Sequence, residues 1–163
     1  MCLIGTASTI DDDVRFTLDT NILVYALRSE ASERREIAQR LLRLSKNHAC
    51  VLTLQSLGEL FRVLTSRKVG LPPSEAAAIV NSLRDAMPVV SASQVCLDEA
   101  MDADVHHGWS FWDAMIWATA KQHGCRLLIT EDGQSGRTLG GVTLVNPFLP
   151  DAGGFLAAAL GRG

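Results

Sequence analysis

Two carboxylates in this chain lie at the ends of short apolar runs that have the composition of β-strands. Asp19 follows residues 14–18, and Asp132 lies just beyond the run 126–130. In an open α/β sheet, ligands bind just beyond the carboxyl ends of the strands, so both acids stand where chemistry is usually done. Asp19 could instead cap the helix that follows, because aspartate accepts bonds from the free N–H groups at a helix start. Glu131, which precedes Asp132, is the alternative candidate at the end of the second run.

Two more carboxylates lie on predicted helices, and the patterns around them explain them poorly. Glu59 lies off the apolar face of its helix, where an ordinary exposed glutamate is the simplest alternative. Asp113 is the only charged residue in the most apolar helix, residues 111–120. A capping box with Ser110 as N-cap would explain the spacing of Asp113 but not its apolar surroundings. The buried face of the helix that carries Glu59 is predicted to be Leu54, Leu57, Phe61 and Leu64.

The order of the predicted elements brings these acids together. A strand followed by a helix recurs about five times, with connections long enough to cross over. This order predicts an α/β fold, in which a central, mainly parallel sheet of about five strands is flanked by helices. Asp19 and Asp132 then meet at one edge of the sheet, which the helices of Glu59 and Asp113 can flank. Carboxylates crowded in one cleft repel each other, and Mg²⁺ or Mn²⁺ with oxygen ligands relieves that repulsion. Such a site activates water and neutralises the charge of a phosphodiester.

A predicted helix after Ser32 carries a basic stripe opposite its apolar face. These arginines could contact phosphate, but the charged side of an amphipathic helix is usually only its solvated face. Both interpretations stay open. The arginines concerned are Arg34, Arg35, Arg40 and Arg43.

The composition indicates one folded domain. With 163 residues, of which 47% are hydrophobic and 20% charged, the chain can bury a real core and is not intrinsically disordered. A net charge of −3 gives no global attraction to nucleic acid, so any such contact must come from local patches or bound cations. The cysteines form no CxxC pair and no apolar run could span a membrane, so we expect a cytoplasmic protein with reduced thiols. Residues 1–13 are predicted to be a polar leader, and residues 149–163 a tail with a loose, Ala/Gly-rich end.

Four motifs, taken in order, resemble the PIN domain, especially the VapC-type toxins of bacterial toxin–antitoxin pairs. They are LDTNIL around Asp19, SLGELF around Glu59, SFWDAMIWATA around Asp113 and LLITEDGQSGRTLGGVTLVNPF around Asp132. The likeness spans residues 14–148, and the order of the four motifs is far more specific than any single one. Gly133 departs from the pattern, because a larger apolar residue is expected there in such toxins.

The resemblance implies a three-layer, PIN-like nuclease domain over residues 14–148 that hydrolyses RNA with Mg²⁺ or Mn²⁺. It implies that the metal-binding catalytic acids are Asp19, Glu59, Asp113 and Asp132, supported by Asn21 and Thr130. The arginine stripe becomes a plausible RNA contact. The resemblance further implies the toxin of a VapBC-type pair, with a cognate antitoxin protein as partner and a homodimer. The alternative is a catalytically silent PIN-like module that binds RNA or protein, which the presence of all four acids disfavours.

Overall fold

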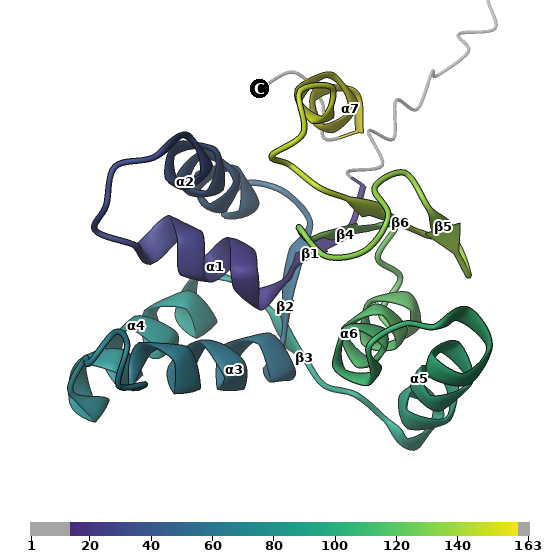
Figure 1. Ribbon diagram of the computed structural model, residues 1–163, viewed down its shortest axis with the longest axis horizontal. Helices are drawn as coiled ribbons and strands as arrows, with labels where there is room; N and C mark the ends of the chain where they lie inside the picture. Colours follow the sequence, from purple (N-terminus) through teal and green to yellow (C-terminus); the bar gives the residue numbers. More distant parts are fainter. Residues whose placement is uncertain (1–13, 160–163) are drawn as a thin grey trace, which may run out of the picture.

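The computed structural model describes residues 14–159, and the leader predicted for residues 1–13 lies outside them. These residues form three layers, with a six-stranded sheet between two groups of helices (Figure 1). The predicted α/β class and mainly parallel sheet are confirmed, with six strands rather than about five. The strands are β1 (Phe16–Leu18), β2 (Cys50–Thr53), β3 (Val89–Val90), β4 (Leu127–Ile129), β5 (Thr138–Leu139) and β6 (Val142–Val145).

The strand order, β3-β2-β1-β4-β6-β5, places a reversal point beside β1. The chain moves outward from β1 to β2 and β3, and then crosses back to the other side of β1 to form β4. All neighbouring strands are parallel except β5 and β6. At such a reversal point an open α/β sheet has a crevice at the carboxyl ends of its strands. Leu18 pairs with Ile129, so the residues that follow β1 and β4 emerge side by side.

The helices cover the two faces of the sheet unequally. They are α1 (Thr20–Leu27), α2 (Glu33–Ser45), α3 (Leu54–Leu64), α4 (Pro73–Ala86), α5 (Gln94–His107), α6 (Phe111–Gln122) and α7 (Ala152–Ala159). Helices α1 to α4 and α7 share one core with Phe16, Leu18 and Ile129, whereas α5 and α6 share another with Leu128. Successive strand residues point to opposite faces, so Leu128 and Ile129 belong to cores on opposite sides of the sheet. Helix α6 therefore lies across the sheet from α1. In residues 14–159 no helix is both long and apolar enough to cross a bilayer.

The buried face of α3 differs from the predicted one. Leu54, which was expected to be buried, is 59% exposed, and Leu60 is completely buried in its place. The buried stripe is centred on Leu57, Leu60 and Leu64, which follow the i, i+3, i+7 spacing of one helical face. Leu54 is the first residue of the helix and lies to one side of that stripe.

Two elements near the C-terminus were not predicted. Strand β5 pairs with β6 through the turn Gly140–Gly141, in which both glycines have positive φ, as tight hairpin turns require. Helix α7 replaces the loose end expected from the Ala/Gly-rich composition, as far as residue 159. Leu156 joins the core beneath α7, and its burial offsets the two helical glycines, which cost about 1 kcal/mol each.

Candidate active site

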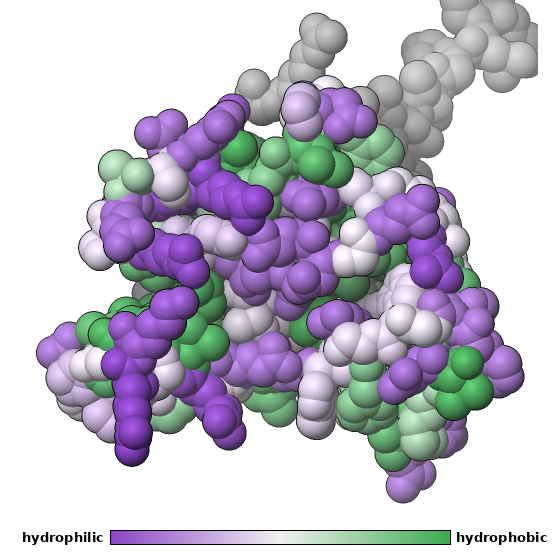
Figure 2. Space-filling view, viewed as in Figure 1, coloured by the Kyte–Doolittle hydropathy of each residue, from purple (hydrophilic) through white to green (hydrophobic). Residues whose placement is uncertain are grey.

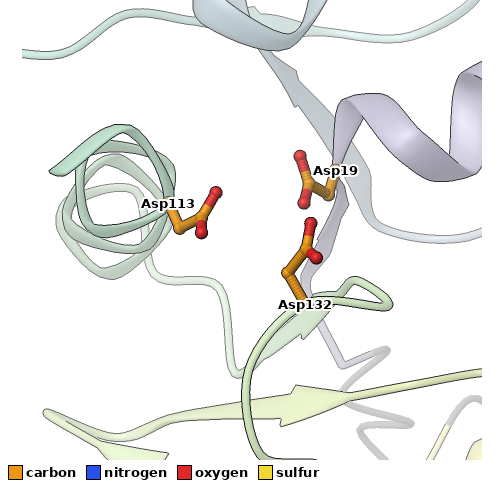
Figure 3. Close-up of side chains that lie close together, drawn as sticks. All are labelled: Asp19, Asp113 and Asp132. Carbon is orange, nitrogen blue, oxygen red and sulfur yellow. The ribbon is translucent and has the colours of Figure 1, made fainter. Parts of the chain in front are cut away.

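Three carboxylates meet at the reversal point of the sheet. Asp19 follows β1, Asp132 lies in the loop after β4, and Asp113 points toward both from the first turn of α6 (Figure 3). One oxygen of each side chain lies within 4.8 Å of the others. Among residues 14–159 this is the one group of His, Cys, Asp or Glu side chains placed to hold a metal ion. We call these three residues the acid cluster. Figure 2 shows hydrophilic side chains gathered over this part of the face, between α1 and α6.

Asp19 is 6% exposed, and both of its carboxylate oxygens accept hydrogen bonds. Oδ1 accepts from the backbone N–H of Thr20 at 2.6 Å, so Asp19 is also the N-cap of α1. Oδ2 accepts from Thr130 Oγ1 at 2.7 Å and from Asn21 Nδ2 at 3.1 Å. The Asn21 amide also lies 2.9 Å from Asp132 Oδ2, and Thr130 Oγ1 accepts from the backbone N–H of Asp132 at 3.0 Å. Asn21 and Thr130 therefore contact both acids.

The acid cluster holds negative charge that its surroundings do not compensate. Burial raises the pKa of Asp19 to about 6, and the charges of Asp113 and Asp132 add to this against the opposing hydrogen bonds. The pKa of Asp113 is also raised, first by burial and then by the charges of Asp132 and Glu59. In the described part of the chain no lysine or arginine forms an ion pair with any of the three acids. A positively charged ligand would therefore stabilise this cluster.

The position of Asp113 is set by α6 without a capping box. Ser110 is the N-cap of α6, as predicted, but its side chain makes no capping bond to the helix backbone. The Ser110 hydroxyl instead lowers the pKa of Asp113 by hydrogen bonding to it, against the larger effect of burial. The carboxylate thus remains directed at the other two acids.

Glu59 lies outside the acid cluster but faces a hollow that the three acids also line. The hollow has a volume of about 310 Å³ and extends from the cluster along α1. Glu59 Oε2 accepts from Thr20 Oγ1 at 2.8 Å, and Oε1 accepts from Gln55 Nε2 at 2.8 Å. Thr20 therefore links Glu59 to the helix that Asp19 caps. The sequence did not predict this contact, because no motif or spacing singled out Thr20.

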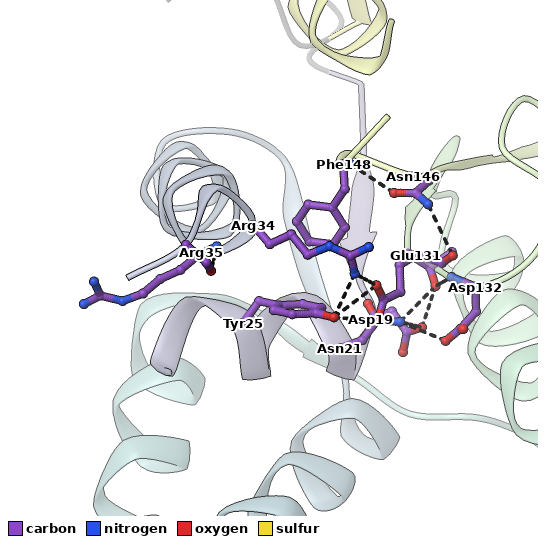
Figure 4. A network of polar contacts seen from close by, with 11 residues as sticks. Asp19, Asn21, Tyr25, Arg34, Arg35, Glu131, Asp132, Asn146 and Phe148 are labelled. Carbon is purple, nitrogen blue, oxygen red and sulfur yellow. Dashed lines mark hydrogen bonds and ion pairs between the residues drawn. The ribbon is translucent and has the colours of Figure 1, made fainter. Parts of the chain in front are cut away.

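Asp132, and not Glu131, belongs to the acid cluster. Glu131 lines the hollow that extends along α1, where it forms an ion pair with Arg34 and accepts from the Tyr25 hydroxyl at 3.2 Å. The guanidinium of Arg34 lies 5.4 Å from the ring centroid of Tyr25 and 5.0 Å from that of Phe148 (Figure 4). Arg34 is thus held beside the site by one ion pair and two aromatic rings.

The other predicted arginines do not join this network, since Arg35 is the next residue on α2 and Arg40 and Arg43 lie farther along the helix. Figure 4 shows Arg35 directed away from the Arg34 network. Arg40 lines a groove between α2 and the segment 147–157, and Arg43 is exposed in the last turn of α2. Of the four arginines in the stripe, Arg34 is the one that contacts a neighbour of the acid cluster.

The donor chemistry of the acid cluster fits a hard divalent cation. All of its candidate ligand atoms are carboxylate oxygens, which Mg²⁺ and Mn²⁺ prefer to nitrogen or sulfur. Burial, with a smaller contribution from the neighbouring carboxylates, raises the pKa of Asp19 and of Asp113, so a bound cation would stabilise the ionised form of both groups. Asp19, Asp113 and Asp132 are accordingly the residues that could hold such an ion.

The fold and this cluster define an α/β domain with a candidate acidic metal centre at the reversal point of its sheet. The chain belongs to the PIN domain family, whose model matches residues 16–138. No curated protein matches it in sequence.

Several solved structures share the fold. VapC20 of Mycobacterium tuberculosis, a sarcin-ricin loop cleaving toxin, has a TM-score of 0.57 at 23% identity, over 69% of this chain and 86% of VapC20. A toxin–antitoxin complex from Klebsiella pneumoniae has a TM-score of 0.56 at 21% identity, over 81% and 97% of the two chains. DNA-bound VapBC from Salmonella typhimurium has a TM-score of 0.60 at 16% identity, over 80% and 96%.

Proposed function

We propose that this protein is a divalent-metal-dependent endoribonuclease and the toxin of a VapBC-type toxin–antitoxin pair. The observation that carries the proposal is the acid cluster, which lies at the reversal point of a PIN-domain sheet and consists of oxygen donors alone. Its uncompensated charge favours a bound cation, and its position at the carboxyl ends of β1 and β4 leaves it open to a substrate. Membership of the PIN domain family supports the same reading.

In this proposal Asp19, Asp113 and Asp132 hold Mg²⁺ or Mn²⁺, and Glu59 completes the set of catalytic acids. When bound, the cation would lower the pKa of water and offset the charge of the RNA phosphate. Asn21 and Thr130 keep Asp19 and Asp132 in their relative orientation through the hydrogen bonds that they share.

Glu59 is proposed to accept the proton of the attacking water. Each of its oxygens accepts one hydrogen bond in the structure, and a carboxylate has about four acceptor sites, so capacity for a proton remains. Thr20 and Gln55 fix its orientation toward the hollow shared with the acid cluster. A positioned general base of this kind contributes typically 10²- to 10⁴-fold to the rate.

RNA binding is proposed to use Arg34 directly. The Arg34 guanidinium is held beside the site by Glu131, Tyr25 and Phe148, where it can contact a phosphate next to the one that is cleaved. Arg35 is directed away from this network, and Arg40 and Arg43 lie farther along α2, so we propose that these three add only general electrostatic attraction.

The proposed partner is a small antitoxin protein that presents an arginine or lysine to the acid cluster, because a cation from the partner can replace the metal. The Klebsiella pneumoniae structure is a toxin–antitoxin complex, and the Salmonella typhimurium structure is a VapBC assembly bound to DNA. By the same family likeness we propose a homodimer. An antitoxin complex that cleaves RNA as fast as the free protein would contradict the proposed inhibition.

The central experiment is RNA cleavage by the purified protein with Mg²⁺ or Mn²⁺, with and without excess chelator. We expect cleavage only with the metal, and a loss of about 100-fold or more in Asp113→Asn, because a metal ligand is neutralised. Asp85→Asn, on the exposed side of α4, is the matched control and should cleave at the parent rate. Thermal melting of both variants checks that they are folded.

Two outcomes would contradict the proposal. Undiminished cleavage by Asp113→Asn in chelator would show that the acid cluster is not the nuclease site. RNA binding by the parent without cleavage at any metal concentration would instead support the silent binding module.

A further inference from the structure

A cavity of about 290 Å³ lies against the acid cluster, on the side away from Glu59. It opens between residues 107–110, which connect α5 to α6, and residues 132–137 in the loop after β4. Asp19, Asp113 and Asp132 form part of its lining. A ligand in this cavity would therefore lie next to the acid cluster.

The cavity has an aromatic and cationic wall. Trp109, which is half-buried, packs edge to face against Trp117 with ring centroids 5.5 Å apart. The Arg137 guanidinium carbon lies 5.2 Å from the Trp109 ring centroid, so the two side chains hold each other in place. Ile116, Leu128 and Leu144 supply the apolar part of the lining.

Polar groups on the same wall are available to a ligand. Gln134 and Arg137 bond to each other through their backbones, and their side chains form no hydrogen bond with another residue in the range 14–159. Arg137 also forms no ion pair within that range. The wall thus offers the all-donor guanidinium of Arg137 and an amide that can donate and accept.

Gly133 keeps the wall beside the acid cluster free of a side chain. Its φ is +79°, and a Cβ built there would lie 2.8 Å from Cδ2 of Leu144. A larger residue would therefore strain the backbone and crowd Leu144 at the lining. The sequence position at which a larger apolar residue was expected is the position that opens this cavity.

We infer that the cavity is a subsite for one nucleobase of the RNA, next to the phosphate that is cleaved. This inference rests on the proposed ribonuclease function. Unstacked RNA bases are bound by stacking on aromatic rings or arginine planes and by hydrogen bonds to their edges, and this wall provides both. The cavity has room for one planar group but not for a length of strand. The three carboxylates in its lining disfavour an anion, so a neutral ring is the fitting occupant.

The chemistry of Arg137 also selects among the bases. A guanidinium can only donate, so it pairs best with a base edge that presents two neighbouring acceptors. Guanine presents such a pair in O6 and N7, to which arginine binds in a bidentate manner. An unpaired cytosine presents O2 and N3, but its single ring offers less area for stacking than the double ring of guanine. The subsite should therefore prefer guanine.

The first test uses free nucleosides, which carry no phosphate and require no metal. Indole N–H signals of ¹⁵N-labelled protein are recorded in chelator while guanosine, adenosine, cytidine or uridine is added. We expect guanosine to shift the Trp109 signal most, and Trp112, which is 60% exposed and outside the cavity lining, to stay unchanged. Arg137→Gln should remove the preference for guanosine, whereas Arg84→Gln on α4 should keep it. No response of Trp109 to any nucleoside would overturn the inference.

The second test measures cleavage of RNA oligonucleotides that differ only in the base beside the cleavage site. Arg137→Gln should reduce the preference for guanine by about tenfold or more, because it removes a bidentate contact, while cleavage beside the other bases continues. Cleavage with an unchanged base preference, together with no nucleoside response, rejects the subsite and leaves the nuclease proposal standing. A guanosine response in a protein that cleaves no RNA rejects the nuclease proposal and leaves the subsite standing.

Discussion

The stability of the metal-free protein should depend on pH through Asp19, and Asp19→Asn should remove most of that dependence. The pKa of Asp19 is about 6 in the folded protein, against an ordinary value of 3.8. Because the folded-state pKa is the higher one, protonation favours folding. The contribution is fully present below pH 3.8 and is lost as the pH rises through about 6. At about 1.4 kcal/mol per pKa unit, the loss is about 3 kcal/mol.

Asparagine at position 19 removes this titration but keeps the helix cap. Its amide oxygen can still accept from the Thr20 N–H, since asparagine caps about as well as aspartate. Its amide nitrogen takes the place of the oxygen that accepts from Thr130 and Asn21. A donor there faces two other donors, so part of the gain in stability is lost. We therefore expect the variant, in chelator at pH 7.5, to melt a few degrees above the parent, at roughly 2–4 °C per kcal/mol. Asp113, whose pKa is also raised, leaves a smaller slope of the same sign.

The assay is urea and thermal unfolding of parent and variant between pH 5 and 7.5, first in chelator and then with Mn²⁺. At a hundred times its dissociation constant the cation should stabilise the parent by about 2.7 kcal/mol, and the variant by less. Asp85→Asn, whose side chain is 74% exposed in the parent, is the control and should behave as the parent does. The reasoning fails if the metal-free parent is equally stable across this pH range, or if Asp19→Asn keeps both the pH slope and the metal response.

Three further predictions concern single contacts. Arg34→Ala should weaken RNA binding and lower its salt dependence by about one phosphate contact, as seen in titrations at several salt concentrations; an unchanged slope makes Arg34 only a partner of Glu131. Thr20→Val should slow cleavage through Glu59 with little change in melting temperature, whereas an equal rate means that this hydrogen bond does not position the base. Leu156→Ala should lower the free energy of unfolding by about 2 kcal/mol, because it leaves a void beneath α7, and an unchanged urea midpoint would return that segment to a loose end.

The strand–acid junctions could be predicted because local sequence determines them. The apolar runs before Asp19 and Asp132 are short and buried, and each ends at a carboxylate, so strand ends and acids could be located from composition alone. The crossover connections then implied that neighbouring strands are parallel. The carboxyl ends of parallel strands lie at the same edge of the sheet, so Asp19 and Asp132 were expected there together. Asp113 stood out because a charge among apolar residues needs a compensating group, and in the structure it faces the other two acids, so a bound cation would supply that compensation.

What could not be predicted depends on contacts between distant segments or on very short elements. Strand β5 has two residues, too few to show an alternating pattern, although the Gly140–Gly141 turn was a usable signal. Helix α7 contains two glycines, and only its packing on the core makes it stable. The cavity at Trp109 and Arg137 is formed by two loops that meet only in three dimensions, and no spacing in the sequence relates them.

The two interpretations of Asp19, as helix cap and as metal ligand, are compatible because they use different lone pairs. Oδ2 accepts two hydrogen bonds, and Oδ1 accepts one from the Thr20 N–H. A carboxylate has about four acceptor sites in all, so one site remains free, and it is on Oδ1. A negative charge at a helix N-terminus is usually stabilised, by about 0.3–1 kcal/mol, yet the pKa of Asp19 is raised. Burial beside two other acids therefore outweighs the helix and its hydrogen bonds together. A further positive charge would reverse that balance, and the free site on Oδ1 is where Asp19 can accept it.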